Sequence, residues 1–304
     1  DNEVVAQLHF TVSQEHLNIF KQNVEELLPK YEEMFNIRYD ISYSVQKPST
    51  DTIAVDMNNE PFRNNDGSLL FRPGGHGALI ENLNDLHKEI VFIKNIDNVV
   101  PDRLKDVTYD YKKALGGYLF KLQQQLFEYL QLLDDGCLTE EEIEEIRVIA
   151  KEKLMIDIPN YYDTYTDIEK IDFLFGKLNR PMRICGMVKN EGEPGGGPYW
   201  VRNTNDEISL QIVESSQINH NDENQENIFK SATHFNPVDL VCGVRNAQGE
   251  KFDLTQYTDP STGFISSKSS GGRDLRAQEL PGLWNGAMAK WNTILVEVPI
   301  TTFS

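Results

Sequence analysis

Cysteine is scarce in this chain, and long hydrophobic runs are missing. The 304 residues include three cysteines, Cys137, Cys185 and Cys242, which are too few and too widely spaced for a disulfide framework or a zinc cluster. The longest apolar runs, such as Ile90–Ile93, have the length of a strand, which argues against a transmembrane helix. We therefore expect a soluble protein in the reducing environment of the cytoplasm, with no membrane partner.

Positive charge is in deficit as well. The chain has 29 Lys and Arg residues against 48 Asp and Glu residues, a formal net charge of −19. This balance argues against a protein that binds nucleic acid or anionic membranes by bulk charge. Hydrophobic residues make up 39% of the chain, which is enough for a core, and the length predicts about two domains or one large α/β domain with insertions.

The first 45 residues show the spacing of a strand, a helix and a second strand. Residues 4–12 are extended and apolar, Ser13 is a candidate helix N-cap, and apolar residues recur at helical spacing from Leu17 to Leu27. Pro29 is expected to end or kink this helix. Strict alternation over residues 37–45 predicts a strand with one exposed face. This order is typical of a parallel α/β sheet.

The remaining chain falls into stretches of different character. We predict a loop over residues 47–72 and a buried central strand over 89–96, because that segment is apolar at consecutive positions. Long helices follow, with a capping box that begins at Thr139. The predicted parts are an α/β part over 1–101, a helical insertion over 102–179, and a second α/β part of the same domain over 180–304.

A glycine-rich segment, Pro73-Gly74-Gly75-His76-Gly77, directly precedes a predicted helix. Its small residues leave backbone N–H groups accessible and would let a flat ligand approach closely. An ordinary loop before a helix is the alternative.

Asp97 follows the predicted strand over 89–96, within Asn95-Ile96-Asp97-Asn98. Open α/β sheets bind ligands at the carboxyl ends of their strands, and a carboxylate there can hold Mg²⁺, which bridges nucleotide phosphates. A solvated aspartate in a loop is the alternative.

Two later stretches combine glycines with polar side chains. A glycine loop, Gly192–Pro198, is followed by Gln211–Glu214, and Glu279 precedes a segment that includes Asn285 and Gly286. Amides and carboxylates pair with sugar hydroxyls, and glycine admits the sugar ring, so both stretches are candidates for a sugar pocket. Ordinary turns and core positions are the alternative.

Several other types of site are disfavoured. Asp134-Asp135-Gly136 lacks the alternating ligands of a calcium loop, and the six histidines show no metal spacing. The sequence has no Gly-x-Ser-x-Gly motif for a nucleophilic serine.

Taken in order, these stretches resemble the UDP-sugar pyrophosphorylase type of nucleotidyltransferase. That family has a Gln/Pro-containing stretch, which Val45–Pro48 resembles, and a Pro-Gly-His-Gly or Asn-Gly-Asn-Gly loop at the nucleotide base, which Pro73–Gly77 resembles. Its Asp-Asn pair at metal and sugar phosphate resembles Asp97-Asn98. Its Val-Val-Glu-Tyr-Ser-Glu pattern at the sugar resembles Ile212–Gln217. Its Phe-Asn-x-Gly-Asn pattern is loosely matched by Trp284–Met288. The whole chain also resembles an uncharacterised bacterial domain family close to these enzymes.

The resemblance implies a fold and a set of site residues. The fold would be α/β and GT-A-like (Rossmann-related), with a mixed, mainly parallel sheet flanked by helices and a helical insertion. Asp97 would be the catalytic residue and the ligand of Mg²⁺, the implied cofactor. The residues implied in nucleotide binding, in residues 1–101, are Gln46, Gly74, Gly75, His76 and Gly77. Those implied in sugar binding, mostly in residues 180–304, are Asn98, Glu214, Glu279, Asn285 and Gly286.

The implied reaction forms an NDP-sugar, with UDP as the expected nucleotide, and pyrophosphate from a nucleoside triphosphate and a sugar 1-phosphate. The family's Gly-x-Gly-Thr-Arg-like phosphate loop has no match in residues 1–50, so we expect the chain to be incomplete or to have lost that loop. The alternative is a non-catalytic protein or subunit that binds a nucleotide sugar. A glycosyltransferase is a third possibility, which an Asp-x-Asp motif would favour, and the sequence has none. The partners would be the nucleotide and the sugar phosphate.

Overall fold

The computed structural model describes residues 4–192 and 195–303, and it divides the chain into two units. Unit 1 comprises Asp1–Leu86 and Ile265–Leu283, and unit 2 comprises His87–Phe264 and Trp284–Ser304. The boundaries differ from those of the three parts predicted along the sequence, because residues 265–283 return to unit 1 from a distant part of the chain. The assignment of functions to the three predicted parts stays a prediction.

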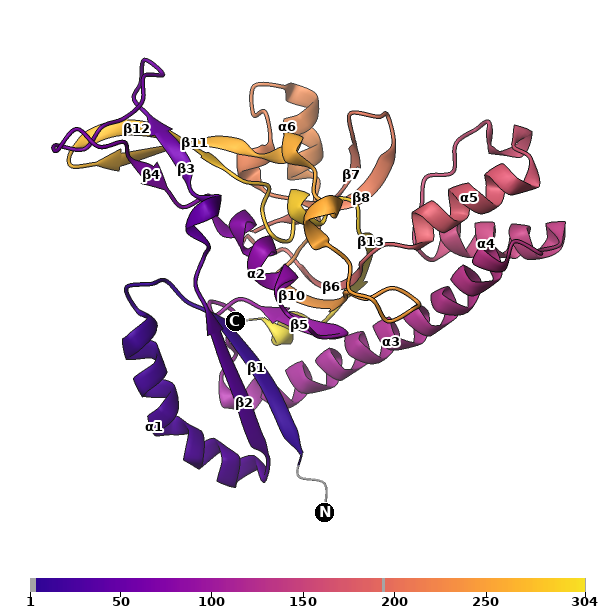
Figure 1. Cartoon of the computed structure of the whole chain (residues 1–304), viewed down its shortest axis with the longest axis horizontal. Helices are drawn as coiled ribbons and strands as arrows, with labels where there is room; N and C mark the ends of the chain where they lie inside the picture. The colour runs from indigo at the N-terminus through magenta and orange to yellow at the C-terminus, as the bar shows by residue number, and fades with distance from the viewer. Residues whose placement is uncertain (1–3, 193–194, 304) are drawn as a thin grey trace. The chain divides into compact units, whose positions relative to one another are not determined.

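Unit 1 begins with the predicted strand, helix and strand: β1 (Val5–Thr11), α1 (Leu17–Phe35) and β2 (Arg38–Ser44) (Figure 1). The two strands pair in parallel, as predicted. The helix N-cap is His16 rather than Ser13, whose hydroxyl forms a hydrogen bond with His16 Nδ1 at 2.7 Å instead. The helix continues through Pro29, so of the predicted end or kink the end is excluded and the kink stays a prediction.

The rest of unit 1 contains a second sheet, and two of its strands lie in the segment predicted as a loop. Its strand order is β11-β12-β3-β4, and helix α2 follows the glycine-rich loop. A small apolar core, Ala54, Phe62, Leu275 and Ala277, lies in this part of unit 1. The bounds are β3 (Thr52–Val55), β4 (Phe71–Arg72), α2 (Ile80–Asn84), β11 (Phe264–Ser270) and β12 (Arg273–Glu279).

Unit 2 contains a larger sheet, against which helix α3 packs. The sheet order is β13-β6-β10-β5, with the short strand β9 paired to β6, and β7 and β8 form a separate hairpin. The strands are β5 (Ile90–Lys94), β6 (Met182–Lys189), β7 (Gly197–Arg202), β8 (Ile208–Val213), β9 (His234–Phe235), β10 (Asp239–Gly243) and β13 (Asn292–Glu297). The helices are α3 (Lys105–Asp135), α4 (Glu140–Glu152), α5 (Asp167–Leu178) and α6 (Glu223–Lys230).

The helices α3, α4 and α5 form the predicted helical segment. The predicted capping box is present: the Thr139 N–H donates to Glu142 Oε2 at 2.8 Å, and the Glu142 N–H donates to Thr139 Oγ1. Leucines of α3, among them Leu115, Leu119 and Leu126, are buried in one cluster with apolar residues of β6 and β10. Figure 1 shows α3 passing along this sheet.

The strand directions in the main sheet of unit 2 differ in part from the predicted mixed, mainly parallel sheet. Strand β6 is parallel to β13 and antiparallel to β10, which is antiparallel to β5 in turn. Three strands, β5, β6 and β13, therefore run the same way, with the reversed strand β10 between β5 and β6. The prediction of a mixed sheet is confirmed, but among the described strands antiparallel pairs predominate, so "mainly parallel" is wrong.

Strand β5 is not the central strand that its apolar run predicted. It lies at one end of the described strand order and pairs with β10 alone, and Phe92 is 50% exposed. The ring of Phe92 covers Gly116 of α3, where an added Cβ would lie 2.7 Å from Cζ. None of the five residues of β5 is fully buried, in contrast to the neighbouring strand β10, where all five are.

Candidate functional site

A cavity of about 630 Å³ lies in unit 2, next to the point where β6 ends. Asn190, directly after β6, lines it, and so does His234 of β9, the strand that pairs with the end of β6. Because β5, β6 and β13 run the same way, their carboxyl ends share this edge of the sheet, where open α/β sheets bind ligands. The full lining is Asn190, Gly195, Gly197, Tyr199, Glu214, Ser215, Ser216, Phe229, Lys230, Ala232, His234 and Phe235.

Two glycines of the predicted loop pack closely against neighbouring side chains in the wall of this cavity. A Cβ on Gly196 would lie 2.6 Å from Cγ2 of Ile212, and a Cβ on Gly195 would lie 2.8 Å from the ring of Phe235. Such approaches exclude a larger residue without movement of the wall. Residues 193 and 194 of the predicted loop lie outside the described residues.

Glu214 directly follows β8 and lines the cavity, and its predicted role in sugar binding stays a prediction. Its Oε1 accepts a hydrogen bond from Nε1 of Trp284 at 3.2 Å. The hydroxyl-bearing residues Ser215 and Ser216 line the same cavity. A carboxylate and two hydroxyls in one concave site can accept and donate hydrogen bonds to a polyhydroxy ligand.

An aromatic pair lines another part of the cavity. The rings of Tyr199 and Phe229 stack with centroids 5.9 Å apart and an interplanar angle of 19°. The Tyr199 hydroxyl donates to the carbonyl oxygen of Phe229 at 2.9 Å, which fixes both side chains relative to α6. Lys230, the next residue, forms an ion pair with Glu226 at 2.8 Å.

Asn236, next to the lining residue Phe235, supports the wall of this cavity and was not singled out by the sequence. Its amide nitrogen donates to the carbonyl oxygen of Gly186 in β6 at 2.8 Å, and its backbone N–H donates to the carbonyl oxygen of Gly196 at 2.8 Å. Its Oδ1 accepts from the N–H of Val238, which has a left-handed φ of 59°. A β-branched residue is strained in this left-handed conformation, so the surrounding structure must hold the turn.

A signal for this turn was present in the sequence. The dipeptide Phe235-Asn236 matches the first two positions of the Phe-Asn-x-Gly-Asn pattern, whereas Trp284-Asn285 matches the second alone. Phe235 lines the cavity, whereas Trp284 is not a lining residue. Asn285 is 2% exposed and Gly286 is buried beside it, and neither is a lining residue. The sugar-binding role given to these two residues remains a prediction.

Asn98 connects the end of β5 to the same turn. Its amide nitrogen donates to the carbonyl oxygen of Pro237 at 3.0 Å, and its side chain is buried. The neighbouring Asp97 is exposed, and its Oδ2 accepts from the Asn95 amide at 3.3 Å. Asp97 and Asn98 thus lie near the sheet edge that carries the cavity, and their roles in binding metal and sugar stay predictions.

The other predicted residues lie in unit 1, where Glu279 meets the glycine-rich loop. A Cβ on Gly75, which has φ 75°, would lie 2.8 Å from Oε2 of Glu279, and the Leu283 N–H donates to Nδ1 of His76 at 3.0 Å. The Glu279 carboxylate pairs with Lys268 at 3.0 Å. Glu279, predicted for the sugar, therefore lies with residues predicted for the nucleotide base.

Packing accounts for two glycines of this loop. A Cβ on Gly77 would lie 2.1 Å from the carbonyl oxygen of Pro281, and a Cβ on Gly74 would lie 2.8 Å from that of Thr50. Gln46 donates from Nε2 to Thr50 Oγ1 at 3.3 Å, so it belongs to the same region of unit 1. Close approach of the chain to itself thus requires Gly74 and Gly77.

The cysteines do not form a nucleophilic or a metal site. All three are free, and burial raises the pKa of Cys185 to about 11 and that of Cys242 further. Such thiols stay protonated near neutral pH. Within residues 4–192 and 195–303, no group of three or more His, Cys, Asp and Glu side chains is arranged to hold a metal ion.

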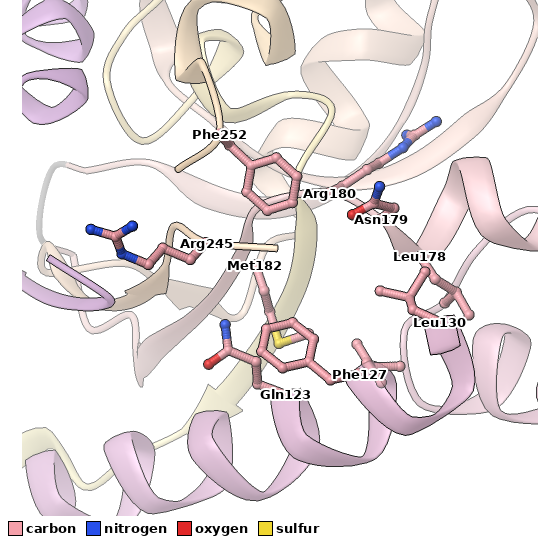
Figure 2. A pocket seen from close by; sticks show the side chains of 10 residues that line it. Gln123, Phe127, Leu130, Leu178, Asn179, Arg180, Met182, Arg245 and Phe252 are labelled. Atoms are coloured by element: carbon pink, nitrogen blue, oxygen red, sulfur yellow. The ribbon is translucent and has the colours of Figure 1, made fainter. Parts of the chain in front are cut away.

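A second cavity in unit 2 is too small for an organic ligand. Its volume is about 10 Å³, roughly that of a single water site. Figure 2 shows Phe127, Leu130 and Met182 lining it, with the side chains of Arg180 and Arg245 at opposite sides.

A histidine beside the large cavity makes the stability of unit 2 depend on pH. Hydrogen bonds from His220 Nδ1 to Glu226 at 2.6 Å, and from Nε2 to the Ser215 carbonyl oxygen, raise the pKa of His220. When the pKa of a histidine is higher in the folded state than in the unfolded state, its protonation stabilises the folded protein. This stabilisation is complete below the unfolded-state pKa near 6.5 and is lost as the pH rises through the folded-state pKa. From about pH 6 to about pH 9, the wild type is expected to lose more thermal stability than His220→Gln. Parallel melting-temperature profiles of the two proteins would contradict this assignment.

None of the helices in the described part of the chain combines the length and apolar character that a membrane span needs. A family model with the description "Domain of unknown function (DUF4301)" matches residues 1–304. The chain belongs to the DUF4301 family. No curated protein matches this DUF4301 chain.

The solved structures similar to the DUF4301 chain include two mutants of UDP-glucose pyrophosphorylase from Leishmania major. One has a TM-score of 0.49 and 15% identity, over 97% of this chain and 52% of that one. The other, in complex with UDP-glucose, has a TM-score of 0.49 and 14% identity, over 99% and 52%. A putative UDP-N-acetylglucosamine pyrophosphorylase from Entamoeba histolytica has a TM-score of 0.43 and 11% identity, over 96% and 58%. The DUF4301 chain therefore spans about half the length of these structures.

Proposed function

We propose that this chain binds a nucleotide sugar, with the sugar in the cavity of unit 2, and that it serves sugar-1-phosphate nucleotidyltransfer. The observation that carries the proposal is the position of Glu214. Its carboxylate lines a cavity at the carboxyl edge of the sheet, and the Trp284 indole fixes its orientation. Charged acceptors in fixed positions give strong, directional hydrogen bonds to hydroxyl groups.

The remaining lining fits the other parts of a sugar. Glycine at positions 195 and 197 provides a wall without side chains, and the stacked rings of Tyr199 and Phe229 offer apolar surface to the C–H face of a ring. Ser215 and Ser216 add hydroxyl groups. The volume of about 630 Å³ is within the range of small-molecule sites.

Asp97 would hold Mg²⁺ in the proposed reaction. Mg²⁺ is typically held by one or two carboxylates together with phosphate oxygens and water, so an exposed aspartate at the sheet edge fits it. The ion supplies neutralisation of phosphate charge. In the proposed reaction, a phosphate oxygen of the sugar 1-phosphate attacks the α-phosphorus of the nucleoside triphosphate, and pyrophosphate leaves. The contribution of the chain is to bind and orient the reactants.

We propose nucleotide-base binding for unit 1 on separate grounds. Gln46 and the Gly74–Gly77 loop lie in one region there, with the His76 ring oriented by the Leu283 N–H. Because packing already requires Gly74 and Gly77, the base contacts are assigned to Gln46, Gly75 and His76. Gln46→Ala tests this assignment, because loss of the Gln46 side chain should weaken the binding of UMP.

Asp97→Asn is expected to lower Mg²⁺-dependent pyrophosphate release from UTP and glucose 1-phosphate by roughly a hundredfold or more, since charge stabilisation dominates such transfers. The fold should be unaffected, because the side chain is exposed and contacts Asn95 through one hydrogen bond in the described residues. Asp110→Asn, an exposed position on α3, is the matched control. Unchanged turnover in Asp97→Asn would overturn the metal assignment. Binding of UDP-glucose without any turnover in the wild type would favour the non-catalytic alternative.

A further inference from the structure

Arg183, the second residue of β6, is fully buried in unit 2 with 0% exposure. Within the described residues no carboxylate lies at ion-pair distance from it. Its Nε donates to Thr293 Oγ1 at 2.9 Å, and its Nη1 donates to the carbonyl oxygen of Trp284 at 2.6 Å. Burial lowers the pKa of its guanidinium. A neutral side chain of similar size could be buried here at lower cost, so stability does not explain an arginine.

The contacts of Arg183 converge on the segment 284–289. Nη1 also approaches the Met288 sulfur at 3.4 Å. Gln211 of β8 donates from Nε2 to the carbonyl oxygen of Ala289 at 2.8 Å, which holds the other end of the segment. Arg183 thus holds the backbone at Trp284, and Gln211 connects the segment to β8, the strand that ends directly before Glu214.

Trp284 connects Arg183 to the cavity through two hydrogen bonds. Arg183 fixes its carbonyl group, and its indole Nε1 donates to Glu214 Oε1 at 3.2 Å. Two hydrogen bonds therefore join a residue with no access to the cavity to a carboxylate that lines it. A shift of the Trp284 backbone would move the indole N–H away from Glu214, whose side chain also accepts from the Gln217 N–H, and would so change the orientation of the carboxylate.

We propose that Arg183 is a positioning residue which, through Trp284, sets the Glu214 carboxylate and thereby gives the site its preference for a nucleotide sugar over the free nucleotide. The inference rests on the proposed function, because it assigns Glu214 to the sugar. Arg183 itself contacts no ligand. Its effect on binding should therefore disappear when Trp284 can no longer donate to Glu214.

The test is a double-mutant cycle measured by calorimetry with UDP-glucose and with UMP. Arg183→Met is expected to raise the Kd for UDP-glucose about tenfold and to leave the Kd for UMP unchanged. In the Trp284→Phe background the same substitution should have no further effect on either ligand. Arg180→Met, at a half-buried arginine three residues away, is the control. Equal weakening of both ligands, or full additivity with Trp284→Phe, would overturn the inference.

A readout without ligand separates this inference from the proposed function. The chain has three tryptophans, so the indole N–H cross-peak of Trp284 can be assigned in a ¹H–¹⁵N spectrum by its loss in Trp284→Phe. Arg183→Met and Glu214→Gln should each shift that peak, and Arg180→Met should not. A peak unmoved by Arg183→Met would overturn the inference, whereas failure of the wild type to bind UDP-glucose would overturn the proposed function alone. If Arg183→Met does not fold, Arg183→Lys, which keeps the charge and loses the planar donor pair, is expected to move the same peak.

Discussion

Gly77→Ala is expected to destabilise unit 1 by about 3 kcal/mol or more, the upper end of the range for overpacking. The added Cβ would lie 2.1 Å from the carbonyl oxygen of Pro281 and 2.7 Å from that of Leu280. Both contacts are with backbone, which cannot rotate away as a side chain can. Relief therefore requires the glycine-rich loop and residues 280–281 to separate, which would also strain the hydrogen bond from Leu280 N–H to Gly74 at 2.8 Å. Urea denaturation of the two proteins measures the effect.

Gly117→Ala is the matched control for this substitution. A Cβ at Gly117 meets no atom within 4 Å, and the residue lies inside α3, where alanine is favoured over glycine. This substitution should stabilise the protein by about 0.5–1 kcal/mol. Equal stability of Gly77→Ala and the wild type would show that residues 280–281 do not pack on the loop as described.

Glu214→Gln is expected to raise the Kd for UDP-glucose by about tenfold to a hundredfold, because hydrogen bonds to a charged acceptor are worth about 1.5–3 kcal/mol. The amide oxygen of glutamine can still accept from Trp284 Nε1, so the orientation of the side chain and the fold should persist. What the substitution removes is the negative charge that faces the sugar hydroxyls. Titration calorimetry with UDP-glucose gives the change directly.

Glu223→Gln serves as the control for loss of one negative charge near the cavity. Glu223 is exposed in the first turn of α6 and is not a lining residue. Its affinity for UDP-glucose should match that of the wild type. A similar loss of affinity in both variants would mean that overall charge, rather than Glu214, governs binding.

Local signals predicted the elements of this protein well. The capping box at Thr139 and the apolar spacing around residues 4–45 depend on neighbours within a few residues, and the structure contains the capping box, the helix and both strands. The predicted N-cap at Ser13 failed because the chain makes an additional turn before α1. Helix α1 does not end at Pro29, where proline removes one backbone hydrogen bond, and the alternative of a kink stays a prediction.

The pairing of strands that are distant in the chain could not be predicted from the sequence. The placement of β10 between β5 and β6 joins segments about 50 to 150 residues apart, and nothing in the apolar runs specifies which strand lies beside which. The same limit applies to the site. Glu214 was found because its motif is local, but its contact with Trp284 spans 70 residues. Asn236 was missed because its importance lies in bonds to Gly186 and Gly196, which only the folded chain brings together.

The most direct test of the central claim is a crystal structure of this chain with UDP-glucose and Mg²⁺. We expect electron density for the glucose ring in the cavity of unit 2, with a sugar hydroxyl at hydrogen-bond distance from the Glu214 carboxylate. Density for bound UDP-glucose with its glucose outside this cavity, or an empty cavity at saturating ligand, would contradict the account.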